Sequence, residues 1–108
     1  MVNLLEKYSQ YLKTGDAGGI AALFTEDGEF YDAVPSKLGL QPISVRGRES
    51  IEAFFRKMFE QGGLNVTNVA INGNAMRYDV AVGEALLLCL GVVREEDNLI
   101  KGYRVTAV

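Results

Sequence analysis

The sequence predicts a single α+β domain, residues 1–108, in which N-terminal helices lie on one face of a curved, mostly antiparallel sheet. Two observations lead to this prediction. Amphipathic segments dominate the first part of the chain, and β-rich segments separated by turn residues occupy nearly everything after Gly63. Helices gathered before a run of strands are typical of α+β domains. The length of 108 residues and an apolar content of 48% are ordinary for one hydrophobic core.

Two helices are expected before the first strand. Gly15 is a natural end for the first helix, and Asp16 is a natural N-cap for the second. The second helix is expected to bury Ile20, Leu23 and Phe24. In the first helix, the apolar side chains that recur at the spacing of one helical face are Leu4, Leu5, Tyr8, Tyr11 and Leu12.

The first strand is predicted at residues 29–34, after a turn-like run at residues 25–28. Because side chains alternate along a strand, Phe30, Asp32 and Val34 should share one face. A carboxylate on an apolar face is costly unless it is paired, hydrogen-bonded or protonated. Asp32 is therefore a candidate functional residue. The alternatives are a structural aspartate paired with an arginine and an aspartate turned to the mouth of an empty cavity.

A loop is predicted at residues 35–46, because two prolines and a glycine punctuate it. A third helix follows at about residues 48–61, and Gly62-Gly63 ends it. Its stripe of apolar side chains at helical spacing is Ile51, Phe54, Phe55, Met58 and Phe59. We expect this stripe in the core, and the same surface can also form the wall of a pocket.

Four strands are predicted after the third helix. Residues 64–71 and 75–82 form a hairpin around Asn72-Gly73, and the last strand spans residues 99–108. Residues 85–93 are apolar on both pleat faces, which predicts a central strand covered on each side. A second copy of the chain is one such cover, and we therefore expect a homodimer formed through the sheet.

The composition excludes several classes of function. The chain contains no histidine, which removes the commonest general base and the commonest transition-metal ligand. Cys89 is the only cysteine, so neither an internal disulfide nor a thiolate metal cluster can form. We expect no metal and no cofactor. The net charge of -3 argues against a nucleic-acid partner.

The apolar stretches predict a protein without a membrane partner. The longest, residues 85–93, is well short of the ~20 residues that a membrane helix needs. Polar residues from Asn3 onward argue against a signal peptide. The sequence therefore predicts a soluble, cytoplasmic protein.

Three local motifs follow one another at informative distances. They are YSQYLKTGD at residues 8–16, FTEDGEFYD at residues 24–32 and RGRESIEAFF at residues 46–55. Together with the element order, they resemble the nuclear transport factor 2-like superfamily, and most of all its SnoaL-like and ketosteroid isomerase-like branch. The resemblance implies a cystatin-like cone, in which the sheet wraps around the N-terminal helices and encloses a pocket. The superfamily contains isomerases, cyclases, hydrolases and non-catalytic binders, so it does not define a reaction.

The resemblance also implies roles for two residues. Asp32 matches the aspartate with which the isomerases remove a proton, and Tyr8 matches the tyrosine that stabilises the dienolate oxyanion. Such a carboxylate acts on a proton next to a carbonyl while the phenol donates to the developing enolate. A core tyrosine with a satisfied hydroxyl is the alternative for Tyr8. The expected walls of this pocket, which would bind a small apolar molecule, are Phe24, Phe30, Phe54, Phe55 and Met58.

The chain departs from the isomerases at three places. Their second, protonated aspartate has no counterpart in residues 90–92, Leu-Gly-Val. Phe24 and Phe55 replace tyrosines that support the catalytic one, and residues 34–45 are longer than their counterpart. Steroid isomerisation is therefore not expected. Two hypotheses follow: a cofactor-independent isomerase or lyase acting on an apolar carbonyl compound, and a non-catalytic ligand-binding or dimeric assembly module.

Overall fold

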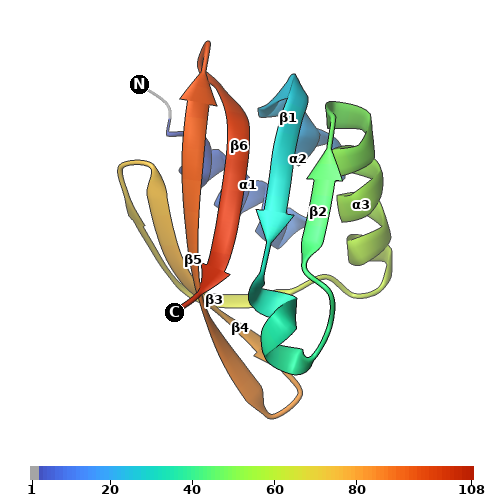
Figure 1. Cartoon of the computed structure of the whole chain (residues 1–108), viewed down its shortest axis with the longest axis vertical. Coiled ribbons are helices and arrows are strands. Elements are labelled where there is room, and N and C mark those ends of the chain that lie inside the picture. Colours follow the sequence, from blue (N-terminus) through green and yellow to red (C-terminus); the bar gives the residue numbers. More distant parts are fainter. Residues whose placement is uncertain (1–2) are drawn as a thin grey trace.

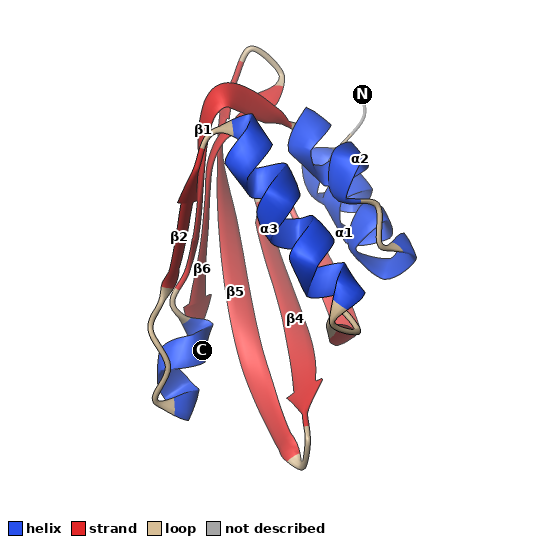
Figure 2. Cartoon of the chain, turned by 90° about the vertical axis from the view of Figure 1, so that its right-hand side faces the viewer, coloured by secondary structure: helices blue, strands red, loops and turns tan. Residues whose placement is uncertain are grey.

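Three helices lie against one face of a six-stranded sheet in the computed structural model, which describes residues 3–108 (Figure 2). The helices are α1 (Leu4–Thr14), α2 (Ala17–Ala22) and α3 (Arg48–Glu60), and a short 3₁₀ helix, η1 (Val34–Leu38), follows the first strand. The strands are β1 (Phe24–Asp32), β2 (Ile43–Arg46), β3 (Asn65–Asn72), β4 (Ala75–Val82), β5 (Ala85–Glu96) and β6 (Leu99–Ala107). Their order across the sheet is β2-β1-β6-β5-β4-β3, and only the β1–β6 pair is parallel. The α+β class is confirmed.

Side-chain caps determine where the first two helices begin. The Asn3 side chain accepts hydrogen bonds from two N–H groups in the first turn of α1, at 2.8 and 3.2 Å. The Asp16 carboxylate accepts one from the Gly19 N–H at 2.8 Å and so starts α2. Gly15 ends α1 with a φ of 74°, a conformation that glycine adopts without strain. The second helix is shorter than predicted, because Phe24 already belongs to β1.

The beginning of β1 differs from the predicted turn. The pairing of β1 with β6 is irregular between Phe24 and Glu29, so residues 25–28 form a distorted part of the strand. Gly28 allows this distortion, because a Cβ there would lie 3.1 Å from the Ile100 carbonyl oxygen and from the Phe24 side chain. At the other end, Val34 is buried as expected for that face, but it begins η1 rather than ending the strand.

The segment predicted as a loop, residues 35–46, contains both η1 and β2. Pro35 lies in the first turn of η1, where its fixed φ is compatible with a helix. β2 pairs antiparallel with β1, placing Val45 opposite Phe30. A four-residue strand carries too little alternation to be recognised from sequence, and its pairing partner β1 is what stabilises it.

The C-terminal strands form the predicted antiparallel meander, with β5 between β4 and β6. Cys89 and Val93 are buried on the helix side of β5. Leu86, Leu88 and Val92 are exposed on the other side, where residues 3–108 form no covering layer (Figure 1). The expected central strand is therefore present, but residues 3–108 cover only one of its two faces. No helix between residues 3 and 108 is long and apolar enough to cross a membrane.

Candidate functional site

A pocket of about 180 Å³ lies between the inner face of the sheet and α3, next to η1. Its wall is mostly apolar, and its ionisable groups are the side chains of Asp32, Tyr8 and Tyr78. The structure brings Asp32 and Tyr8 together with four of the five expected wall residues, namely Phe30, Phe54, Phe55 and Met58. These six residues therefore line one pocket.

Phe24 is the exception among the expected wall residues. Its side chain is fully buried in the core and does not line the pocket. Phe24 begins β1 and Asp32 ends it, so the length of the strand separates the two. The Phe24 carbonyl oxygen instead accepts hydrogen bonds from the Arg48 guanidinium at 2.7 and 3.1 Å, which connects the start of β1 to α3.

Asp32 is half-buried at the end of β1, on the same face as the buried Phe30. Its Oδ1 accepts a hydrogen bond from the Val34 N–H at 2.9 Å. Burial raises the pKa of the carboxyl group, and the bond from Val34 partly opposes this. Three ion pairs are found between residues 3 and 108, and none involves Asp32. The alternative of an arginine-paired structural aspartate therefore finds no support in the described part of the chain.

Tyr8 is buried in α1 beside aromatic rings from the sheet and from α3. Its ring makes edge contacts with Tyr103, at 4.9 Å between centroids, and with Phe55, at 6.1 Å. Burial raises the pKa of the Tyr8 phenol well above its ordinary value, and the nearby Tyr103 and Asp32 raise it further. Tyr8 therefore stays protonated at physiological pH and can act as a hydrogen-bond donor.

Two further tyrosines, which the sequence reasoning missed, lie in the same region. Tyr78 in β4 lines the pocket, and burial raises its pKa far above the ordinary value. Tyr103 in β6 is buried behind it, and burial raises its pKa as well. Tyr78 alternates with the buried Met76 and Val80, so the pleat pattern of β4 could have placed it on the inner face. Its distance of seventy positions from Tyr8 along the chain hid their proximity.

The Tyr103 ring explains the departure from the isomerase pattern at residues 90–92. Gly91 faces inward, and a Cβ at this position would lie 2.1 Å from the Tyr103 hydroxyl oxygen and 2.5 Å from Cζ. The ring therefore occupies the space that a side chain at position 91 would need. The Tyr103 hydroxyl is the one buried side-chain polar group without a hydrogen-bond partner in residues 3–108. The phenol of Tyr103 in β6 therefore lies where a side chain at position 91 of β5 would otherwise be.

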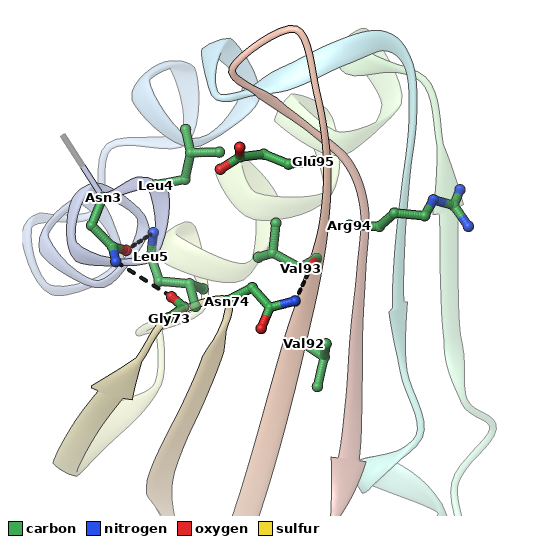
Figure 3. A pocket seen from close by; sticks show the side chains of 9 residues that line it. All are labelled: Asn3, Leu4, Leu5, Gly73, Asn74, Val92, Val93, Arg94 and Glu95. Carbon is green, nitrogen blue, oxygen red and sulfur yellow. Dashed lines mark hydrogen bonds between the residues drawn. The ribbon is translucent and has the colours of Figure 1, made fainter. Parts of the chain in front are cut away.

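A larger hollow, of about 690 Å³, lies outside this region, between the start of α1, the β3–β4 turn and β5 (Figure 3). The amide of Asn3 donates to the Gly73 carbonyl at 3.3 Å, and the amide of Asn74 donates to the Val93 carbonyl at 3.1 Å. Glu95 extends into the hollow, whereas Arg94 points away from it. Because both amides are already engaged, we place the candidate site in the smaller pocket. No cluster of three or more potential metal-binding side chains occurs in residues 3–108.

Comparison with known proteins identifies the family of this chain. The family model described as the SnoaL-like domain matches residues 5–87. The chain belongs to the SnoaL-like family. The matched range contains every lining residue of the pocket. No curated protein matches the sequence.

Solved structures share the fold of this SnoaL-like domain at low sequence identity. A protein from Sphaerobacter thermophilus is similar over 97% of this chain and 93% of its own, with 19% identity and a TM-score of 0.77. A Catenulispora acidiphila protein with a ketosteroid isomerase-like fold, solved in complex with trimethylamine, has 13% identity over 96% and 84%, with a TM-score of 0.68. A Silicibacter pomeroyi protein with a cystatin-like fold has 18% identity over 100% and 75%, with a TM-score of 0.73. These similarities establish the predicted cystatin-like fold.

Proposed function

We propose that this SnoaL-like domain binds a small apolar carbonyl compound and acts on it as a cofactor-independent isomerase or lyase. Asp32 is the base in this proposal, and Tyr8 is the hydrogen-bond donor. The observation that carries it is the presence, in one apolar pocket, of a half-buried carboxylate with a raised pKa beside phenols that stay protonated. The family resemblance supports the same assignment, since Asp32 and Tyr8 match the isomerases' base and oxyanion donor.

The proposed proton transfer needs only groups in the pocket. The Asp32 carboxylate accepts a proton from the carbon next to the carbonyl, and the C–H electron pair becomes a carbon–carbon π bond while charge develops on the oxygen. Tyr8 donates a hydrogen bond to that oxygen, and Tyr78 is placed in the same pocket to donate a second. In a substrate with a double bond between the β- and γ-carbons, the enolate is extended to the γ-carbon, and return of the proton there completes an isomerisation. Burial of the carboxylate favours this role, because it raises the pKa of Asp32 towards neutrality and makes the carboxylate a stronger base.

Exchange of α-protons for deuterium tests this proposal without knowledge of the natural substrate. Methyl ketones from pentanone to undecanone are incubated with the protein in D₂O, and loss of the α-proton signal is followed by NMR. The wild type should accelerate exchange, and Asp32→Asn should lose at least about a hundredfold of that acceleration, the scale of a catalytic base.

The matched control for that experiment is Asp79→Asn. Asp79 lies next to Tyr78 on the opposite pleat face, where its carboxylate accepts a hydrogen bond from Asn68 at 2.7 Å. The same chemical change on the outer face should leave the exchange rate unaltered. Exchange that is equally fast in wild type and Asp32→Asn, or no acceleration with any ketone, would exclude Asp32 as the base.

The outer face of the sheet favours a second candidate function, a binding or assembly module that forms a homodimer. Leu86, Leu88 and Val92 expose apolar side chains in one row of β5, on a face that no other part of residues 3–108 covers. Rows of this kind often mark protein interfaces. A second copy of the chain, packed sheet to sheet, would cover the row.

Sedimentation equilibrium tests the dimer. The wild type should sediment at twice the mass of 11.8 kDa, and Leu88→Lys should shift it towards the monomer. A wild-type monomer across the accessible concentration range would contradict the assembly proposal. A dimer whose wild type also exchanges α-protons would combine the two functions, since they use opposite faces of the sheet.

A further inference from the structure

Four apolar side chains at the pocket are exposed to solvent, although the sequence places them far apart. They come from four segments: η1, the loop after it, the loop between α3 and β3, and the end of β4. The residues are Leu38, Leu40, Leu64 and Val82. Their exposed fractions lie between 40% and 62%, yet all four line the pocket. We call these four residues the rim.

The rim is apolar, and the tyrosine hydroxyls of the pocket belong to buried residues. The phenols of Tyr8 and Tyr78 lie in the buried part of the wall, whereas the exposed part is apolar. Leucine and valine side chains gain free energy when they leave water, so exposing four of them around one opening is unfavourable without a partner. A ligand that matches this arrangement has a polar head for the interior and an apolar part for the opening.

The size of the cavity gives the second argument. Its volume of about 180 Å³ is below the roughly 300–1,000 Å³ typical of pockets that enclose a whole drug-sized ligand. A ligand of ordinary size therefore fills the interior with its head only. The remainder lies over the opening, where the rim provides apolar contacts.

We propose that the pocket takes an amphiphilic carbonyl compound, whose carbonyl head lies among Asp32, Tyr8 and Tyr78 and whose hydrocarbon tail lies along the rim. The identity of the head rests on the function proposed above, and the placement of the tail rests on the rim. A lipid surface is a poorer occupant on the grounds of charge. The segments that carry the rim, residues 34–42, 62–65 and 81–85, contain one basic residue, Lys37, and one acidic residue, Glu84. Surface binding to anionic membranes uses clusters of basic residues.

Binding of methyl ketones of increasing length tests the placement of the tail. Dissociation constants are measured by calorimetry from pentanone to undecanone. Transfer of each methylene from water to an apolar contact strengthens binding by roughly fourfold. For the wild type, the affinity should keep rising through the longest ketones. For the double variant Leu40→Ser/Leu64→Ser, it should follow the wild type for short ketones and then level off.

The control is Leu86→Ser, which removes a leucine of similar exposure, 58%, from the opposite face of the sheet. Its neighbour Leu87 lines the pocket, so Leu86 points away from it. This variant should keep the wild-type dependence on chain length. The proposal would be overturned if the rim variant also kept the wild-type dependence on chain length. It would equally be overturned by a wild type whose affinity stops rising at short ketones, or by one that binds no ketone. Rim-dependent binding to phosphatidylcholine vesicles without a chain-length effect would assign the rim to lipid surfaces and overturn it too.

The same ketones separate this inference from the proposed function. Chain-length dependence that the rim variant loses, with no α-proton exchange by the wild type, would refute the proton transfer and leave the tail placement standing. Exchange that needs Asp32, with equal chain-length dependence in wild type and rim variant, would refute the tail placement alone. Asp32→Asn should lose exchange and keep the chain-length dependence.

Discussion

Gly91 in β5 lies directly beneath the ring of Tyr103 in β6, and this contact can be tested by adding one methyl group. In Gly91→Ala, the new Cβ would lie 2.1 Å from the Tyr103 hydroxyl oxygen, 2.5 Å from Cζ and 2.6 Å from Cε1. All three distances are below any ordinary van der Waals contact. The ring is confined, because it is fully buried and packs on Tyr8 and Phe30, with centroids at 4.9 and 6.0 Å.

The size of the effect follows from overpacking. Inserting a methyl group into a well-packed core costs about 1–3 kcal/mol, and contact with three atoms of a confined ring puts this variant at the upper end. Replacing glycine by alanine returns about 0.4–1 kcal/mol by restricting the unfolded chain. The free energy of unfolding should therefore fall by about 2–2.6 kcal/mol. For a domain of this length, the melting temperature should fall by about 10–20 °C.

Urea denaturation followed by circular dichroism measures this change. Gly102→Ala is the matched control, because a Cβ there would meet its nearest atom, in the Arg94 guanidinium, at 3.5 Å. The control should change the free energy of unfolding by less than about 1 kcal/mol. In a Tyr103→Leu background, Gly91→Ala should be nearly neutral, since the ring is gone. Equal stability of Gly91→Ala and wild type would refute the close contact, and a full loss in the Tyr103→Leu background would refute its assignment to the ring.

The site and the cap of α1 lead to five further predictions. Burial raises the folded-state pKa of Asp32 above the ordinary aspartate value of 3.8. The free energy of unfolding should therefore fall as the pH rises from 3.8 through the folded-state pKa. Asp32→Asn should remove this decline in urea titrations at a series of pH values. α-Proton exchange should rise with pH over the same raised range, and a profile centred on the ordinary value would contradict a buried base. Tyr103→Phe removes an unpartnered buried hydroxyl and should stabilise the fold by up to about 1 kcal/mol. Tyr78→Phe should keep the fold and slow α-proton exchange by about tenfold or more, because it removes a hydrogen-bond donor from the pocket. Asn3→Ala removes the α1 cap and should cost about 1 kcal/mol in thermal or urea unfolding, with Asn72→Ala at the end of β3 as a comparison.

Several residues that line the pocket could be grouped from local patterns in the sequence. Asp32 follows Phe30 by two positions in a strand, so the alternation of side chains placed it on the inner face. Phe54, Phe55 and Met58 follow from the helical stripe in the same way. Tyr8 depended on the family resemblance, because a buried tyrosine on a helix has no pattern that distinguishes it from core.

The features that the sequence did not predict depend on contacts between segments that are distant in the sequence. β2 is too short to show its own periodicity and exists through its pairing with β1. Phe24 was assigned to the pocket because its apolar character is indistinguishable from that of Phe30, whereas its place at the far end of β1 removes it. The exposed leucines at positions 38, 40 and 64 lie in segments without regular alternation, so nothing in the sequence distinguished them from ordinary loop residues.

The sequence alone determined the order of the three α-helices, β1 and the C-terminal meander, the glycines that follow α1 and α3, and the inward face that carries Asp32. These features depend on side-chain periodicity and on the backbone preferences of glycine, asparagine and aspartate, which act within a few residues. Only the tertiary structure decided that Tyr78 and Tyr103 join Tyr8 around one pocket, that Gly91 leaves room for a ring from β6, and that four distant apolar residues form a rim. The physical reason is that these contacts arise from strand pairing and from the packing of the helices on the sheet. Their geometry is therefore defined only in the folded domain.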